Sequence, residues 1–192
     1  MSFVKKVFLV ILLTSVVYIS CSSSKVTNKN VKEDNSVMHG MIYDFNSQPL
    51  SDVEIYVNNV FIVSSDVQGR FLLAFKDSGE YSITLKKNGF EVLSDTFIYN
   101  PLNILYFRIA NAEQLLKRAE YALENHSYDK ALNFVDRALV LENYRNDILY
   151  LKCIICHKLQ KTEEAKKILE DLKNNNCQSF YLEKLESKIL QE

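Results

Sequence analysis

The spacing of apolar residues changes once along this chain, and that change limits the folds it can adopt. Between residues 37 and 109, apolar side chains alternate with polar ones, as at Val53, Ile55 and Val57. A period of two predicts β-strands that bury one face. From about residue 111 the apolar residues recur every three or four positions, which predicts amphipathic helices. We therefore expect a multidomain α+β chain in which a β-domain precedes a helical one.

Turn signals divide the alternating region into short strands. Clusters of turn-forming residues stand at 46–52, 58–59, 66–69, 77–79 and 87–89. Short strands separated by turns at such regular intervals are typical of a β-sandwich. Gly69 stands where a hairpin needs a positive φ, and Gly40 stands where small size permits a close approach.

Five motifs follow one another in this region, at 40–44, 48–55, 65–71, 81–83 and 89–90. Their order and spacing resemble the carboxypeptidase regulatory-like domain, and the most specific part is Asp66 followed by Gly69, Arg70 and Phe71. The resemblance implies a seven-stranded antiparallel β-sandwich of transthyretin type over residues 37–109. It also implies a domain without catalytic residues.

The helical region, 111–192, contains two segments that align with each other. Ala131 aligns with Ala165, and Ala119 aligns with Cys153 at the same spacing. Small residues allow paired helices to approach closely. The period resembles the tetratricopeptide (TPR) repeat and implies a C-terminal TPR-like α-helical hairpin array, with repeats at 112–145 and 146–176 and a capping helix at 179–191. The positions expected to pack between helices are Ala119, Ala131, Ala138, Cys153 and Ala165.

The TPR resemblance also implies a groove that binds peptides and is lined by the first helix of each repeat. The groove positions would be Glu113, Leu116, Glu120, Leu123, Asp147, Tyr150, Ile154 and His157. The alternative is that many of these side chains are only solvated or contact the β-domain. The repeat departs from the family in two places, because Asn143 replaces the usual proline and Thr162 replaces an aromatic residue.

The N-terminus carries a processing signal. Lys5 and Lys6 precede an apolar run from residue 7 to residue 19, which is shorter than the roughly 20 residues of a membrane-spanning helix. Residues 18–21, Tyr-Ile-Ser-Cys, resemble the lipobox of bacterial lipoproteins, with Tyr18 in place of the usual leucine. The resemblance implies a signal peptide at 1–20 and a lipid, including palmitate, on Cys21. An ordinary secretory signal or an uncleaved anchor would be the alternatives.

The polar residues after Cys21 predict a flexible tether over 21–36, because they cannot bury enough apolar surface to fold. Ser22 is not the aspartate that retains lipoproteins in the inner membrane of enterobacteria. We therefore expect a lipid-anchored protein of the bacterial cell envelope, with the outer membrane as the favoured location.

Composition excludes several classes of function. The formal net charge is −1 and no basic block occurs, which argues against a nucleic-acid partner. No glycine-rich phosphate loop and no serine–histidine–acid arrangement is visible. The sequence thus predicts no enzyme, no cofactor, no metal and no small-molecule substrate. The expected function is a non-catalytic scaffold that binds an unidentified envelope protein or peptide.

One motif invites a different interpretation. Cys153, Cys156 and His157 satisfy the C-x-x-C-H pattern of c-type haem attachment. A redox pair, or a zinc site that adds Cys177, would also use these thiols. Their positions in the repeat favour core packing instead, because free cysteine behaves as a small apolar side chain.

A carbohydrate- or cell-wall-binding β-sandwich is the second alternative. It would require exposed aromatic rings on one face, with Tyr43, Tyr56, Tyr81 and Tyr99 as candidates. His39 and His126 are expected to be surface side chains. Asp66 is expected to serve its turn rather than bind calcium.

Overall fold

The computed structural model describes residues 37–143, 145–175 and 180–190. The expected signal peptide, Cys21, the expected tether and Cys177 lie outside the described residues. All described residues belong to one compact unit, Asn35–Glu192. None of the helices within the described ranges is long and apolar enough to cross a membrane.

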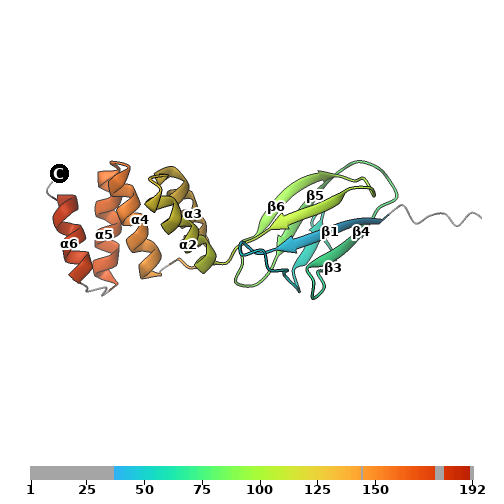
Figure 1. The fold of residues 1–192 in the computed structure, drawn as a ribbon, viewed down its shortest axis with the longest axis horizontal. Helices are drawn as coiled ribbons and strands as arrows, with labels where there is room; N and C mark the ends of the chain where they lie inside the picture. The colour runs from blue at the N-terminus through green and yellow to red at the C-terminus, as the bar shows by residue number, and fades with distance from the viewer. Residues whose placement is uncertain (1–36, 144, 176–179, 191–192) are drawn as a thin grey trace, which may run out of the picture. The chain divides into compact units, whose positions relative to one another are not determined.

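Seven strands in the described part of the chain form two sheets (Figure 1). The three-stranded sheet has the order β4-β1-β7, and the four-stranded sheet has the order β3-β2-β5-β6. The strands are β1 (Val37–Tyr43), β2 (Glu54–Val57), β3 (Val60–Ser64), β4 (Arg70–Ala74), β5 (Glu80–Lys86), β6 (Leu93–Ile98) and β7 (Ile104–Arg108).

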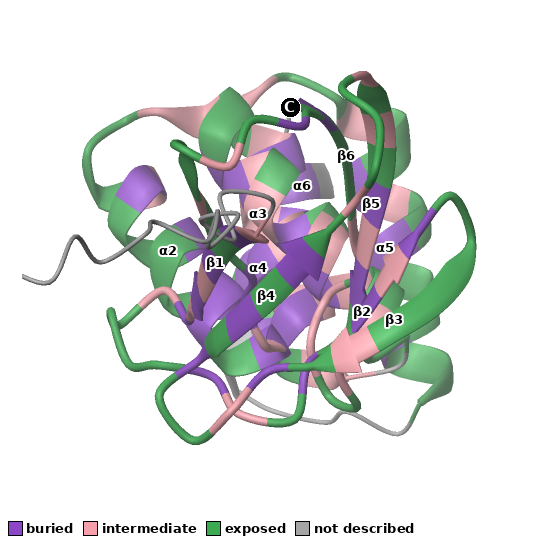
Figure 2. Cartoon of the chain, turned by 90° about the vertical axis from the view of Figure 1, so that its right-hand side faces the viewer, coloured by how far each residue is buried: buried purple, intermediate pink, exposed green. Residues whose placement is uncertain are grey.

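The predicted alternation of burial is present in the strands. Met38, Gly40 and Ile42 of β1 are buried while His39 between them is exposed, and β4 alternates in the same way (Figure 2). The inward side chains of both sheets form one core, in which the largest fully buried members are Met38, Ile42, Ile55, Leu73, Ile83, Leu85 and Ile109. Burying these apolar side chains is the main stabilising contribution to this part of the fold.

Two glycines are required by local geometry, as the sequence predicted. Gly40 lies directly opposite Phe71, and a Cβ on Gly40 would lie 2.0 Å from Cζ of that ring. Gly69 has a φ of +73°, and its Cβ would lie 2.4 Å from the carbonyl oxygen of Ile42. The ring of Phe71 therefore occupies the space that any other residue at position 40 would fill.

The prediction of an entirely antiparallel sandwich is wrong. β1 pairs with β4 in the antiparallel sense but with β7 in the parallel sense, with Gly40 opposite Leu105 and Ile42 opposite Phe107. The three-stranded sheet is therefore mixed. The alternation of apolar residues reports which face of a strand is buried, and it is the same for both strand directions. It could not reveal the direction of β7.

Five helices follow the strands within the described residues: α2 (Ala112–Glu124), α3 (Tyr128–Leu141), α4 (Asn146–Lys158), α5 (Thr162–Asn174) and α6 (Phe180–Leu190). The most extensive helix contacts join α2 to α3 and α4 to α5, and α4 also contacts α3 and α6. Asn111 caps α2, because its side-chain oxygen accepts a hydrogen bond from the backbone N–H of Gln114 at 2.9 Å. The chain therefore turns directly from β7 into a capped helix.

The prediction of a TPR-like array is also wrong, because the structure does not show one. The five expected packing residues, Ala119, Ala131, Ala138, Cys153 and Ala165, are all fully buried. However, the two aligned helices bury different faces. Ile155 of α4 is fully buried, whereas Tyr121, its aligned counterpart on α2, is 65% exposed. Leu151 is buried where Lys117 is exposed, so the two segments are not structural repeats of each other.

Polar contacts join the strands to the helices. The carboxylate of Glu91 accepts bidentate hydrogen bonds from the guanidinium of Arg137 on α3, at 2.7 to 3.0 Å. Glu91 also accepts a hydrogen bond from the backbone N–H of Ala110 at 2.9 Å. Gln114 on α2 donates to the buried carboxylate of Asp44 at 2.7 Å. These charge-assisted bonds fix the chain on both sides of the β7–α2 connection.

Candidate functional site

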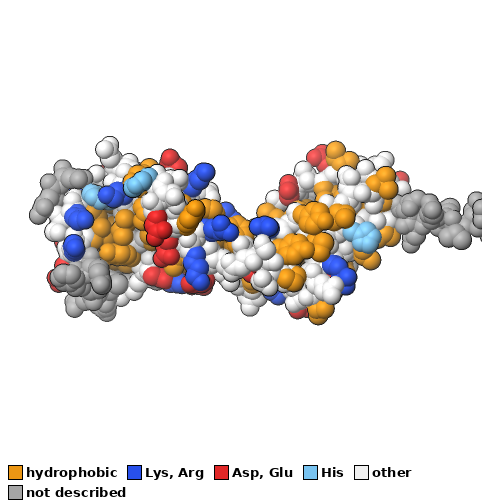
Figure 3. Space-filling view, viewed as in Figure 1, with side chains coloured by type: hydrophobic (Ala, Val, Ile, Leu, Met, Phe, Trp, Pro, Cys, Tyr) orange, Lys and Arg blue, Asp and Glu red, His pale blue; other side chains and the backbone are white. Residues whose placement is uncertain are grey.

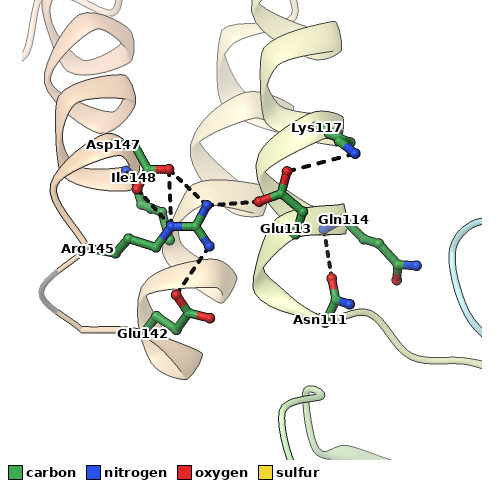
Figure 4. A network of polar contacts seen from close by, with 8 residues as sticks. All are labelled: Asn111, Glu113, Gln114, Lys117, Glu142, Arg145, Asp147 and Ile148. Carbon is green, nitrogen blue, oxygen red and sulfur yellow. Dashed lines mark hydrogen bonds and ion pairs between the residues drawn. The ribbon is translucent and has the colours of Figure 1, made fainter.

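Two of the expected groove residues, Glu113 and Asp147, belong to an ion-pair network around Arg145 (Figure 4). Arg145 immediately precedes α4. Its Nη2 donates to Oε2 of Glu113 on α2 and to Oδ2 of Asp147, both at 2.8 Å. Its Nη1 donates to Oε2 of Glu142 at 3.2 Å. One guanidinium thus joins the start of α2, the residue after α3 and the start of α4.

The network shifts the ionisation of its members. Hydrogen bonding from Arg145 lowers the pKa of the Glu113 carboxyl below its ordinary value. Burial alone would raise the pKa of Asp147, but the hydrogen bonds and positive charge of Arg145 outweigh it, and the pKa is lowered. The hydrogen bonds from Asp147 and Glu113 raise the pKa of Arg145. The two carboxylates are therefore held ionised by Arg145.

We expect Arg145→Met to lower the free energy of unfolding by about 1 kcal/mol at neutral pH, because the partner carboxylates are partly exposed and screened. A carboxyl whose pKa is lowered by folding stabilises the protein above its unfolded pKa and loses that effect as the pH falls through its folded pKa. The difference between wild type and variant should therefore shrink as the pH falls below about 4. Urea unfolding at several pH values measures it.

Lys117→Met is the matched control for this prediction, because Lys117 lies 3.8 Å from Glu113 and is largely exposed. Its effect should stay within about 0.5 kcal/mol at every pH. Equal losses in the two variants, or a loss in Arg145→Met that does not change with pH, would contradict the role assigned to Arg145.

The other expected groove residues on α2 do not form an open surface. Leu116 is buried and Leu123 is partly buried, and both pack in the core that α2 shares with α3 and α4. Glu120 is exposed. The structure therefore does not bring the eight expected residues together in one groove.

Three of the eight, Tyr150, Ile154 and His157 of α4, do line a pocket. The pocket lies between α4 and α6 and has a volume of about 270 Å³. Its remaining lining residues are Lys158 of α4 and Lys184, Leu185 and Lys188 of α6. We call it the α4–α6 pocket. Tyr150 and Ile154 are partly buried and pack on the core formed by α4, α5 and α6.

Among the described lining residues of the α4–α6 pocket, positive charges outnumber negative ones. None of its described lining residues is acidic. Several lysines on α4 and α5 are paired: Lys152 with Asp136 and Glu164, Lys166 with Glu163, and Lys173 with Glu186. No such ion pair with another described residue is found for Lys158, Lys184 or Lys188. The three ammonium groups at the pocket are thus not neutralised by described carboxylates.

Hydrophobic and charged side chains also gather on the surface of the helical part. Figure 3 shows hydrophobic side chains gathered over the helices, with a group of acidic side chains on one side of them and histidine and basic side chains on the other, while further basic side chains lie next to the acidic group.

The sequence interpretation missed the lysines of α6. Lys184 and Lys188 are four positions apart and therefore share one face of a helix. That spacing was visible, but α6 was interpreted only as a terminal cap. The contribution of Arg145 was missed as well, since nothing in the aligned segments indicates which carboxylates it contacts.

Cys153 and Cys156 are fully buried against α5. The Sγ of Cys153 lies 3.3 Å from the carbonyl oxygen of Ala165, to which it donates. Burial raises the pKa of Cys153 to about 12 and that of Cys156 to about 11. Both thiols are therefore protonated at neutral pH, whereas redox and metal chemistry needs the thiolate. The geometry favours core packing over haem attachment or redox activity.

The tyrosines of the carbohydrate-binding alternative are not on one face. Tyr43 lies on the outer side of the three-stranded sheet, and Tyr56 lies on the outer side of the four-stranded sheet. Tyr99 is buried, and Tyr81 stacks on Phe75 at a ring-centroid distance of 4.3 Å inside the sandwich. The four rings cannot form one platform for a sugar.

Other candidate groups serve local structure. Oδ1 of Asp66 accepts hydrogen bonds from the backbone N–H groups of Gln68 and Arg70, and Oδ2 binds the Arg70 side chain. His39 and His126 are exposed. Within the described ranges, no group of three or more His, Cys, Asp or Glu side chains could hold a metal ion.

Comparisons with known proteins show no family for this chain. No protein-family model matches it, and no curated protein matches it. Among solved structures, it is similar to 3-chlorocatechol 1,2-dioxygenase from Rhodococcus opacus 1CP, at 12% identity and a TM-score of 0.28. The match covers 38% of this chain and 57% of that one. A likeness this slight carries no argument about fold or activity.

Proposed function

We propose that this chain is a lipid-anchored protein of the bacterial cell envelope that binds another protein and catalyses no reaction. The observation that carries the proposal is the α4–α6 pocket, which combines apolar side chains with three lysines. Such a pocket suits a partner segment that presents a carboxylate next to an apolar side chain, because the ammonium groups attract the charge and Ile154 and Leu185 receive the apolar group.

The N-terminal sequence supports the membrane part of the proposal. The positive residues, the short apolar run and the Tyr-Ile-Ser-Cys motif together resemble the signal that a lipoprotein signal peptidase processes, with Tyr18 in place of the usual leucine. Lipid on Cys21 would hold the protein at the membrane, and the helices would present the pocket to a neighbouring envelope protein. More than one acyl chain is needed for stable anchoring.

Site-specific photocrosslinking tests the binding part. A photoreactive amino acid at Ile154 should give an adduct with a defined partner in cells, whereas the same group at the exposed Val140 of α3 should not. The pair Lys184→Glu and Lys188→Glu should weaken binding of the purified partner at least about tenfold. Lys167→Glu, an exposed charge reversal on α5, is the matched control and should leave affinity unchanged.

Two results would contradict the proposal. Identical adducts from positions 154 and 140 would show that the pocket selects nothing. An affinity that is equal in the α6 double variant and in Lys167→Glu would exclude the α6 lysines from recognition.

Metabolic labelling with palmitate tests the anchor separately, since Cys21→Ala should abolish the label.

A further inference from the structure

The outer surface of the three-stranded sheet carries several exposed apolar side chains. Its outward side chains include His39 and Met41 of β1, Leu72 of β4, and Ile104, Tyr106 and Arg108 of β7. We call this surface the apolar face. The backbone pairing places His39 between Leu72 and Ile104, and Met41 between Arg70 and Tyr106. These side chains therefore form one continuous patch across all three strands.

The large side chains of the apolar face are well exposed. The exposed fraction is 52% for Leu72, 51% for Ile104 and 64% for Tyr106. Figure 3 shows the same clustering, with hydrophobic side chains gathered over β1 and β4 and a histidine beside them. An apolar patch of this kind on a soluble domain indicates a surface that another body covers.

The outer surface of the four-stranded sheet is mainly polar along β5 and β6. The outward residues of β2, β5 and β6 are mainly polar and include Glu54, Glu80, Ser82, Thr84, Lys86 and Thr96, and we call this surface the polar face. Its exposed apolar residues lie toward its margins, on the edge strand β3 and at Ile98, where β6 ends. Both outer surfaces therefore carry exposed apolar side chains, and they differ in charge, because Glu54 and Glu80 lie on the polar face.

The charged residues of β1, β4 and β7 indicate which kind of surface the apolar face binds. β1, β4 and β7 contain no aspartate or glutamate, while they contain His39, Arg70 and Arg108. The charge of Arg70 is balanced by Asp66, but no ion pair with a described residue is found for Arg108. The strands thus offer exposed apolar groups, a tyrosine and arginine, they contain no carboxylate, and the neighbouring Asp66 carboxylate is paired with Arg70. This composition matches the interface of an anionic lipid bilayer.

The short distance in sequence between Cys21 and the apolar face supports a lipid surface as the binding partner. Its central strand, β1, begins at Val37, 16 positions after Cys21. A chain of that length spans roughly 20 Å on average, so a lipid on Cys21 would keep the face near the bilayer surface and raise its local concentration there. We propose that the apolar face docks on an anionic lipid surface, an inference that rests on the proposed lipid anchor.

Vesicle binding of the unlipidated protein tests this docking without the anchor. Residues 21–192 carrying Cys21→Ser should co-sediment with vesicles of phosphatidylglycerol and phosphatidylcholine, and much less with phosphatidylcholine alone. Leu72→Glu and Tyr106→Glu should each reduce the partition coefficient about tenfold or more, since each removes an apolar contact and adds a repelled charge. Thr96→Glu, on the polar face, should have no effect.

Several outcomes would overturn the inference. Absence of vesicle binding would do so, as would binding that Leu72→Glu and Tyr106→Glu do not change. Equal binding to both lipid compositions would exclude recognition of anionic lipid. If the protein bound no vesicles but bound an acidic protein through this face, that protein and not a lipid surface would be the partner. Circular dichroism melting of each variant confirms folding. If Cys21 carries no lipid in cells but the unlipidated protein binds vesicles, the anchor fails and the docking surface stands.

Discussion

Gly40→Ala is expected to lower the free energy of unfolding by about 2–3 kcal/mol, a large fraction of the stability of a small domain. The added Cβ would overlap the ring of Phe71, with its nearest ring atoms at 2.0 to 2.6 Å. Phe71 cannot move away cheaply, because it is buried and stacks on Phe107 at a centroid distance of 6.4 Å. Chemical denaturation followed by circular dichroism measures the loss.

Two further variants show whether the ring is the cause. Phe71→Leu shortens the side chain, so the double variant with Gly40→Ala should be nearly as stable as Phe71→Leu alone. Gly79→Ala is the matched control, because its Cβ would meet its nearest neighbour, Tyr81, at 3.9 Å. A loss at position 79 equal to the loss at position 40 would indicate a general cost of replacing glycine and would refute the specific clash.

Glu91→Ala is expected to lower the free energy of unfolding by about 2–3 kcal/mol, because three strong hydrogen bonds from Arg137 and one from a backbone N–H lose their acceptor together. The N–H belongs to Ala110, which is fully buried, so water cannot replace the lost carboxylate there. Arg137 would keep its contacts with the rings of Phe45 and Phe134, at 5.6 and 5.5 Å. Urea unfolding measures the loss.

A double-mutant cycle with Arg137→Met isolates the ion pair. The combined variant should lose less than the sum of the two single losses, by about 1 kcal/mol or more. Glu170→Ala removes an exposed glutamate from α5 and should change stability by less than about 0.5 kcal/mol. Fully additive losses at Glu91 and Arg137 would mean that the contact does not hold the strands to the helices.

The sequence predicted local structure better than long-range geometry. Alternation at Val53, Ile55 and Val57 correctly indicated strands with one buried face, and Gly69 correctly indicated a positive φ. These properties depend on neighbouring residues. The parallel pairing of β1 with β7 joins segments that are far apart in the chain, such as His39 and Ile104, and no periodicity records it.

The helical region shows a second limit. Alignment of its two segments correctly identified small buried positions such as Ala131 and Ala165. It did not reveal that α4 is covered on more sides than α2, which is why Ile155 is buried and Tyr121 is exposed. The TPR-like fold was inferred from the spacing of small residues, and such residues occur wherever two helices pack closely.

The candidate site was predicted only in part. Tyr150, Ile154 and His157 line the pocket, whereas Glu113 and Asp147 are bound by Arg145. Glu113 and Asp147 lie apart from the pocket because Arg145 binds both of them where α2, α3 and α4 meet. The spacing of residues in the sequence does not show which carboxylates this guanidinium contacts. The lysines of α6 reach the pocket through tertiary packing, so their role became visible only in the structure.

The pairing of β1 with β7 has a consequence for how the protein forms. Because the first and last strands are neighbours, the three-stranded sheet cannot be completed until residue 108 is available. Contacts between residues so distant in sequence give a high contact order, and β-proteins of this kind fold in roughly milliseconds to seconds. During synthesis, β1 would remain without its partner β7 until residue 108 had been added, and the apolar side chains of β1 would stay exposed for that time.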